Sequence, residues 1–145
     1  MNSDFAIGLH IVGFLTARQG QPLTSEALAD SYGTNAVVIR RVLSRLQHAG
    51  LVETRRGIGG GSVLAQEPSS INLRQVYEAV TDNPEVLRRH PVEGKGVARV
   101  LGVYINDLCR DAERALLRQL ESVTVKQMDA VVRPRIRSAQ CKPKK

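Results

Sequence analysis

Residues 55–61, with the sequence RRGIGGG, constrain the fold of this chain more than any other segment. Three consecutive glycines offer no side chains to a core, but their backbone can turn tightly and approach another surface closely. An apolar pair lies on each side of the segment, at 51–52 and at 63–64. This pattern predicts a β-hairpin with strands over 51–55 and 62–65 and a flexible, positively charged tip.

The remaining apolar residues recur mostly at helical spacing, which predicts a mostly α-helical fold around that hairpin. The expected helices cover residues 4–18, 25–31, 36–48, 73–80, 96–121 and 125–132. Thr24, either Thr34 or Asn35, Asn72 and Thr124 are expected to cap the helices that follow them, because their side chains can accept a hydrogen bond from the first helical turn. Gly50 suits the left-handed position that ends a helix.

Two short helices over 25–31 and 36–48, joined by a tight turn and followed by a basic hairpin, form the layout of a winged helix-turn-helix. In such a motif the second helix lies in the major groove of duplex DNA, and its N-terminal residues reach the base edges. Five arginines and one acid lie between Arg40 and Arg56, which supports a DNA-binding surface.

The residue types at the start of the second helix suit base recognition. Asparagine can read adenine and arginine can read guanine with two hydrogen bonds each, and small apolar side chains can touch a thymine methyl group. Arg45 is expected to meet a phosphate, and Arg56 to enter a narrow A·T-rich minor groove. The expected DNA contacts are Ser25, Thr34, Asn35, Ala36, Val37, Arg40, Arg41, Arg45, Arg55, Arg56, Gly59 and Gly60.

The predicted long helix carries an apolar stripe that the short final helix cannot cover alone. Burying this stripe against a second copy is favourable, so a two-fold homodimer with a pseudo-palindromic operator is expected. The expected dimerisation residues are Val97, Leu101, Tyr104, Leu108, Ala112 and Leu116.

The net charge of +7 comes mostly from residues 133–145, which hold six of the 21 basic residues and no acid. We expect a disordered tail there, which either attracts phosphates or only adds solubility. Aromatic residues are scarce, which disfavours a platform that stacks single-stranded bases.

Cysteine usage and the chain start favour a cytoplasmic protein without a membrane segment. The two cysteines, Cys109 and Cys141, form neither a disulfide framework nor a metal-ligand pattern. Cys109 is either a small buried hydrophobe or a redox-sensitive thiol. No nucleophile elbow, phosphate-binding loop or metal-hydrolase motif occurs, so neither an enzyme nor a metal site is expected.

Several short motifs resemble the Rrf2 family of bacterial transcription regulators over residues 2–124. They are AGLV at 49–52, RGIGGG at 56–61, INLRQVY at 71–77 and AV at 79–80. The resemblance implies a dimeric winged-helix repressor or activator whose long helix crosses its partner and whose wing arginine, Arg56, enters the minor groove. Cluster-binding members hold an iron–sulfur cluster with three cysteines before the long helix. The stretch TNAVVIRR at 34–41 resembles a branch that lacks the cluster. Residues 81–95 contain no cysteine, so no cofactor is expected.

The expected organisation is therefore a winged helix-turn-helix domain (1–80), a loop and helical dimerisation region (81–132) and a basic tail (133–145). One alternative is a winged helix that binds other proteins and not DNA. Another keeps DNA binding and adds an unknown small-molecule or redox effector at the loop of residues 81–95.

Overall fold

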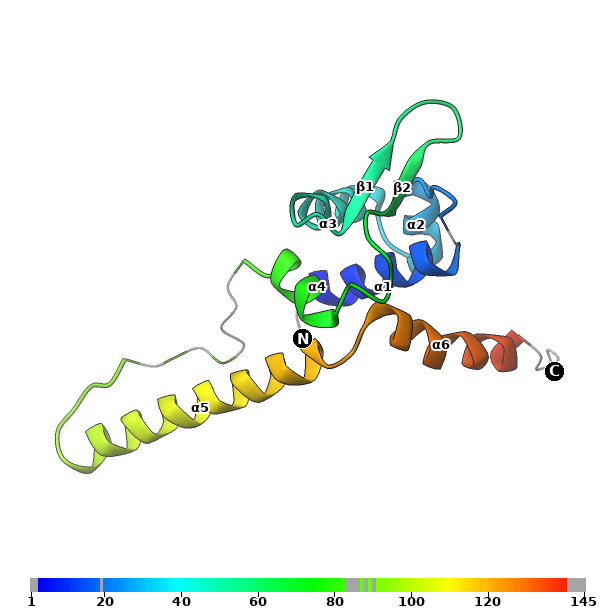
Figure 1. Ribbon diagram of the computed structural model, residues 1–145. Helices are drawn as coiled ribbons and strands as arrows, with labels where there is room; N and C mark the ends of the chain where they lie inside the picture. The colour runs from blue at the N-terminus through cyan, green and yellow to red at the C-terminus, as the bar shows by residue number, and fades with distance from the viewer. Residues whose placement is uncertain (1–2, 19, 83–86, 88, 90, 141–145) are drawn as a thin grey trace, which may run out of the picture.

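The computed structural model describes residues 3–18, 20–82, 87, 89 and 91–140. Over this part of the chain the fold is mostly helical with one two-stranded sheet, which confirms the predicted fold class. The elements in chain order are α1 (Ser3–Ala17), α2 (Ser25–Tyr32), α3 (Ala36–His48), β1 (Val52–Arg55), β2 (Gly61–Leu64), α4 (Leu73–Val80), α5 (Val97–Glu121) and α6 (Val125–Gln140) (Figure 1).

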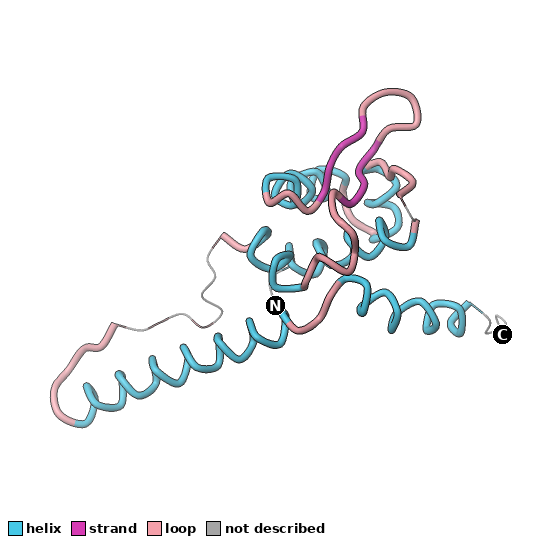
Figure 2. Tube along the Cα trace, viewed as in Figure 1, coloured by secondary structure: helices cyan, strands magenta, loops and turns pink. Residues whose placement is uncertain are grey.

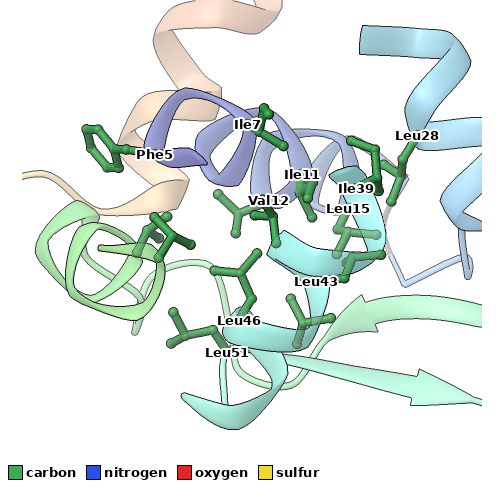
Figure 3. Close-up of a cluster of buried hydrophobic side chains, with 14 of the residues drawn as sticks. Phe5, Ile7, Ile11, Val12, Leu15, Leu28, Ile39, Leu43, Leu46 and Leu51 are labelled. Carbon is green, nitrogen blue, oxygen red and sulfur yellow. The ribbon is translucent and has the colours of Figure 1, made fainter. Parts of the chain in front are cut away.

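The core lies where α1 crosses α3 and α4, and it is filled by aliphatic side chains (Figure 3). Gly8 lets α1 approach α4 closely, since a Cβ there would lie 3.2 Å from Cγ1 of Val76. Phe5 and Tyr77 pack edge to face with ring centroids 5.3 Å apart. The fully buried large side chains are Ile11, Leu28, Ile39, Leu46, Leu51, Ile71, Val12, Val42, Val76, Val80 and Val125.

The helix caps follow the sequence signals. The Thr24 side chain accepts a hydrogen bond from the Ala27 N–H at the start of α2. Asn72 and Gln75 form a reciprocal capping box at the start of α4. Gly50, with a φ of 71°, follows α3 in the left-handed conformation.

The hairpin between α3 and α4 projects from the helical body as a wing (Figures 1 and 2). Its strands pair antiparallel, from Val52 opposite Leu64 to Arg55 opposite Gly61. The base of the wing is fixed to the segment before α2, because Leu23 and Ser62 exchange backbone hydrogen bonds of 3.0 and 2.8 Å. The wing and the helix-turn-helix therefore form one connected surface.

α5 extends away from the body as a long rod, and none of its residues is buried (Figure 1). α6 starts at the body, where Val125 is fully buried, and runs out on the other side. Among the described residues, no helix has the length and apolarity needed to cross a bilayer.

The expected end of the last helix at residue 132 was wrong, because α6 continues through Pro134 to Gln140. Proline inside a helix removes one backbone hydrogen bond. Two features favour continuation: an ion pair of 2.6 Å between Asp129 and Arg133, one turn apart, and the good helix propensity of the arginines on both sides of Pro134. The expected basic tail is thus helical up to residue 140, and residues 141–145 lie outside the described residues.

Candidate nucleic-acid interface

An open groove of about 400 Å³ separates the helix-turn-helix from the wing. One wall comes from α2 and α3, including Ser25, Glu26 and Arg40, and the other from the wing, including Arg55 and Gly60. Arginines line both walls, so the groove offers positive charge to an elongated anion. In a winged helix bound to duplex DNA, a phosphate backbone passes between the helix in one groove and the wing in the next.

The start of α3 presents small and polar side chains at the protein surface. Asn35 and Val37 are exposed, and Thr34 and Ala36 are partly exposed. The Oδ1 atom of Asn35 already accepts a hydrogen bond of 2.8 Å from the Val37 N–H, as an N-cap. The predicted reading of adenine by Asn35 with two hydrogen bonds requires this oxygen as well as the amide nitrogen. The cap restricts Oδ1, whereas Nδ2 stays available to donate.

Arg40 and Ser25 lie together in the helical wall of the groove. Nε of Arg40 donates to Oγ of Ser25 at 3.2 Å, and Nη2 forms an ion pair with Glu26. The backbone N–H of Glu26 itself, and then Arg40, lower the pKa of the Glu26 carboxyl group. The structure thus brings together two expected contact residues and adds an acidic neighbour that sequence analysis missed.

Arg41 and Arg45 are engaged by acids from distant parts of the chain. Nη2 of Arg41 lies 2.6 Å from Oδ1 of Asp4, whose side chain is only 11% exposed. Arg45 donates to the Val80 carbonyl at 2.8 Å and to Asp82 at 2.9 Å, and it lies 3.5 Å from Asp4. These contacts connect α3 to the start of α1 and to the end of α4. In this arrangement Arg45 makes internal contacts, and its expected phosphate contact stays a prediction.

The wing carries the other expected residues at its tip. Arg55 lies 3.8 Å from Glu53 on the same strand, whereas Arg56 is exposed and forms no ion pair with any described residue. Gly60 leaves no room for a side chain, because a Cβ there would lie 2.2 Å from the Arg55 carbonyl oxygen. Gly59, with a φ of 73°, shares this tip with Ile58, whose side chain is fully exposed. Ile58 is not among the contact residues predicted from the sequence.

The outward face of α5 carries the expected dimerisation residues, and the structure leaves all of them exposed. Val97 is 82% exposed and Tyr104 is 63% exposed, which is unusual for apolar side chains at helical spacing. The other large apolar residues exposed on this helix are Val100, Leu101, Val103, Ile105, Leu108 and Leu116, and Ala112 is exposed as well.

The loop before α5 lies against the opposite face of that helix. The Leu87 N–H donates to Glu113 at 3.1 Å, and Val92 lies beside Gly102. Cys109 is a free, partly buried thiol, and its redox role stays a prediction. Residues 83–86, 88 and 90 of the expected effector loop lie outside the described residues.

The donor set does not fit an iron–sulfur cluster. Clusters are held mainly by thiolates, and the only cysteines of the sequence are Cys109 and Cys141. Within the described ranges, no three His, Cys, Asp or Glu side chains gather closely enough to hold a metal ion.

Comparisons with known proteins agree with this geometry. The family model described as "Rrf2: Iron-dependent Transcriptional regulator" matches residues 1–130. YwnA of Bacillus subtilis, an HTH-type transcriptional regulator by name, is 31% identical over 128 residues, which are 87% of this chain and 94% of YwnA. The HTH-type transcriptional repressor NsrR of Streptomyces coelicolor is 28% identical over 106 residues, covering 72% of this chain and 70% of NsrR.

A solved structure supports the fold independently. CymR, the global cysteine regulator of B. subtilis, superposes with a TM-score of 0.73 at 21% identity, over 90% of this chain and 96% of CymR. The family and the relatives are transcription regulators and not enzymes. This chain belongs to the Rrf2 family of DNA-binding transcription regulators.

Proposed function

We propose that this protein is a sequence-specific repressor that binds a pseudo-palindromic operator in duplex DNA as a homodimer in the cytoplasm. One observation carries the proposal: an open groove has the helix α3 on one side and the arginine-bearing wing on the other. A repressor role is consistent with the name of the S. coelicolor relative. Sequence-specific contacts are expected from the start of α3 and from Arg40, and minor-groove contacts from Arg56.

The exposed face of α5 supports the homodimer. Each apolar side chain buried there contributes on the order of 1.5–3 kcal/mol, and the whole face is unpaired in the single chain. A second copy of α5 presents the same face, so a two-fold contact is self-complementary. Two α3 helices then reach two half-sites on one side of the duplex.

Selection of genomic DNA fragments by the purified protein tests the proposed function. We expect a small set of related fragments, each containing an inverted repeat. Affinity for such a fragment should exceed affinity for a scrambled duplex at least a thousandfold, and it should fall steeply as salt rises. A protein-interaction module would show no preference among fragments and no salt-dependent DNA binding.

Substitution of the α5 face tests the homodimer separately. Leu101→Arg and Leu108→Arg place a charge on side chains that are 53% and 56% exposed in the single chain. The variants should therefore stay folded while sedimentation shows monomers and operator affinity falls. Arg110→Ala, on the polar side of the helix, is the matched control and should remain dimeric. A wild-type protein that sediments as a monomer at micromolar concentration would contradict the homodimer.

The proposal includes an effector that acts through the loop of residues 81–95, and it leaves the identity of this effector open. The described part of this loop contacts α5 through Leu87 and Val92, on the face of the helix opposite the proposed dimer contact. Blocking the Cys109 thiol tests a redox effector, because an unchanged operator affinity would exclude it.

A further inference from the structure

Glu26 is an acid in the wall of a groove that otherwise offers positive charge to DNA. Its side chain is 60% exposed, and it lines the groove together with Arg40 and Arg55. A carboxylate at this place weakens the attraction of any phosphate that enters the groove. Glu26 also lies in the first turn of α2, where an acid is favourable, but its exposed ion pair with Arg40 contributes little to stability.

Glu26 and Ser25 hold one edge of the Arg40 guanidinium. Nη2 of Arg40 pairs with Oε1 of Glu26, and Nε donates to Oγ of Ser25 at 3.2 Å. The Ser25 hydroxyl in turn donates to Oε2 of Glu26 at 3.2 Å. Both carboxylate oxygens of Glu26 therefore accept a hydrogen bond, one from Arg40 and one from Ser25. Nη1 of Arg40 makes none of these contacts.

These contacts restrict a side chain that is otherwise long and flexible. An unrestrained arginine beside DNA can turn to the nearest phosphate, and such a contact carries no sequence information. Reading a guanine requires the flat guanidinium in one orientation toward the base edge. Pairing with a carboxylate fixes the plane of the guanidinium and competes with phosphate for it.

We propose that Glu26 is a positioning residue that makes Arg40 selective: it holds the guanidinium for a guanine edge and opposes its contact with phosphate. The proposal rests on the proposed function, because it assumes that Arg40 faces a base in the operator. It predicts effects of opposite sign when the carboxylate is removed. Binding to non-operator DNA becomes tighter, and discrimination between operator and non-operator DNA becomes weaker.

The test uses full-length wild-type protein and the variants Glu26→Gln, Arg40→Ala and the double variant. Each is titrated with a selected operator duplex and with a scrambled duplex, and bound sequences are selected from a randomised duplex pool. Glu53→Gln is the matched control, because it removes the same charge from the wing, where Glu53 lies 3.8 Å from Arg55. Circular dichroism checks that every variant is folded.

For Glu26→Gln we expect about two- to fivefold tighter binding to scrambled DNA and about a tenfold lower operator-to-scrambled ratio. The base preference should weaken at the same operator position at which Arg40→Ala weakens it. The double variant should show the base preference of Arg40→Ala alone, because Glu26 acts through Arg40. Glu53→Gln should change affinity for both duplexes equally.

Two results would overturn the inference while the proposed function stands. In the first, wild-type protein discriminates the operator and Glu26→Gln discriminates it equally well. In the second, Glu26→Gln changes the base preference even when Arg40 is absent, so that Glu26 reads a base itself. If wild-type protein does not discriminate any duplex, the proposed function fails and this inference fails with it.

Discussion

The Asp4 carboxylate at the start of α1 lies 2.6 Å from the Arg41 guanidinium in the middle of α3. Asp4 is nearly buried, and it also lies 3.5 Å from Arg45, one turn further along α3. One carboxylate therefore faces two arginines of the helix that is proposed to enter the major groove. This relationship connects the start of α1 to α3.

Removing the Asp4 charge should destabilise the folded protein. Asp4→Asn keeps the shape of the side chain but weakens its contacts with Arg41 and Arg45, and the latter is only 28% exposed. We expect the free energy of unfolding in urea to fall by about 1–3 kcal/mol. The control is Asp111→Asn, since Asp111 pairs with Arg114 at 3.5 Å in an exposed position, and its loss should be about 0–1 kcal/mol. Equal losses in both variants would contradict this account.

Arg45 should matter more for stability than for DNA affinity. Arg45→Met removes the hydrogen bond to the Val80 carbonyl and leaves Asp4 and Asp82 with fewer partners. We expect a loss of about 1–3 kcal/mol in unfolding free energy and less than a tenfold change in operator affinity. A stable variant whose affinity falls for every DNA sequence would instead identify Arg45 as a phosphate contact.

Arg56 should contribute to binding through the minor groove. Its side chain is exposed at the wing tip, where no described residue forms an ion pair with it. For Arg56→Ala we expect a loss of about 1–3 kcal/mol in operator binding and a weaker preference for A·T-rich sequence beside each half-site. The salt dependence of binding should change little if Arg56 reads groove shape. A uniform loss on all sequences, with a salt slope reduced by about one, would indicate a phosphate contact only.

The backbone of the wing tip should not tolerate a side chain at Gly60. A Cβ there would lie 2.2 Å from the Arg55 carbonyl oxygen and 2.9 Å from that of Gly57. Gly60→Ala should therefore distort the tip and reduce operator affinity while the helical content stays unchanged. Gly13→Ala is the control, because its Cβ would meet only Cε of Met128 at 3.6 Å. Unchanged DNA binding by Gly60→Ala would contradict a role for the wing tip.

Stability should fall at alkaline pH through Tyr77. Burial raises the pKa of Tyr77, and the negative charge of Glu113 raises it further. The folded protein thus holds the phenol proton more tightly than the unfolded chain. This contribution is complete below the unfolded pKa of about 10 and is lost as the pH rises through the folded pKa. Tyr77→Phe should reduce the fall in the urea-unfolding free energy above pH 10, and a fall as steep as in the wild type would contradict this account.

The positions of the helices and of the hairpin could be predicted because their signals are local. The cap residues Thr24 and Asn72 and the stop at Gly50 act within one turn of their own positions. The hairpin is likewise defined by its own glycines and by the apolar pairs around it. α6 is the exception, because Pro134 reads locally as a helix end while the flanking residues continue the helix.

The partners of the arginines could not be predicted, because they come from far along the chain. Asp4 accepts a hydrogen bond from Arg41, and Asp82 accepts one from Arg45. In each pair the two residues lie 37 positions apart in the sequence. Whether an arginine faces DNA or an acid depends on how α1, α3 and α4 pack. A short-range sequence pattern does not predict this packing. The cap role of Asn35, in contrast, has a local signal, because an asparagine directly before an apolar helix is a common N-cap.

Methylation interference on a selected operator fragment tests the central claim most directly. Methyl groups on guanine N7 block the major groove, and methyl groups on adenine N3 block the minor groove. We predict interference from guanines where α3 lies and from adenines in the adjoining minor groove where the wing lies, repeated on two half-sites. Interference confined to one of the two grooves, or none at all, would contradict binding of α3 and the wing to the same duplex.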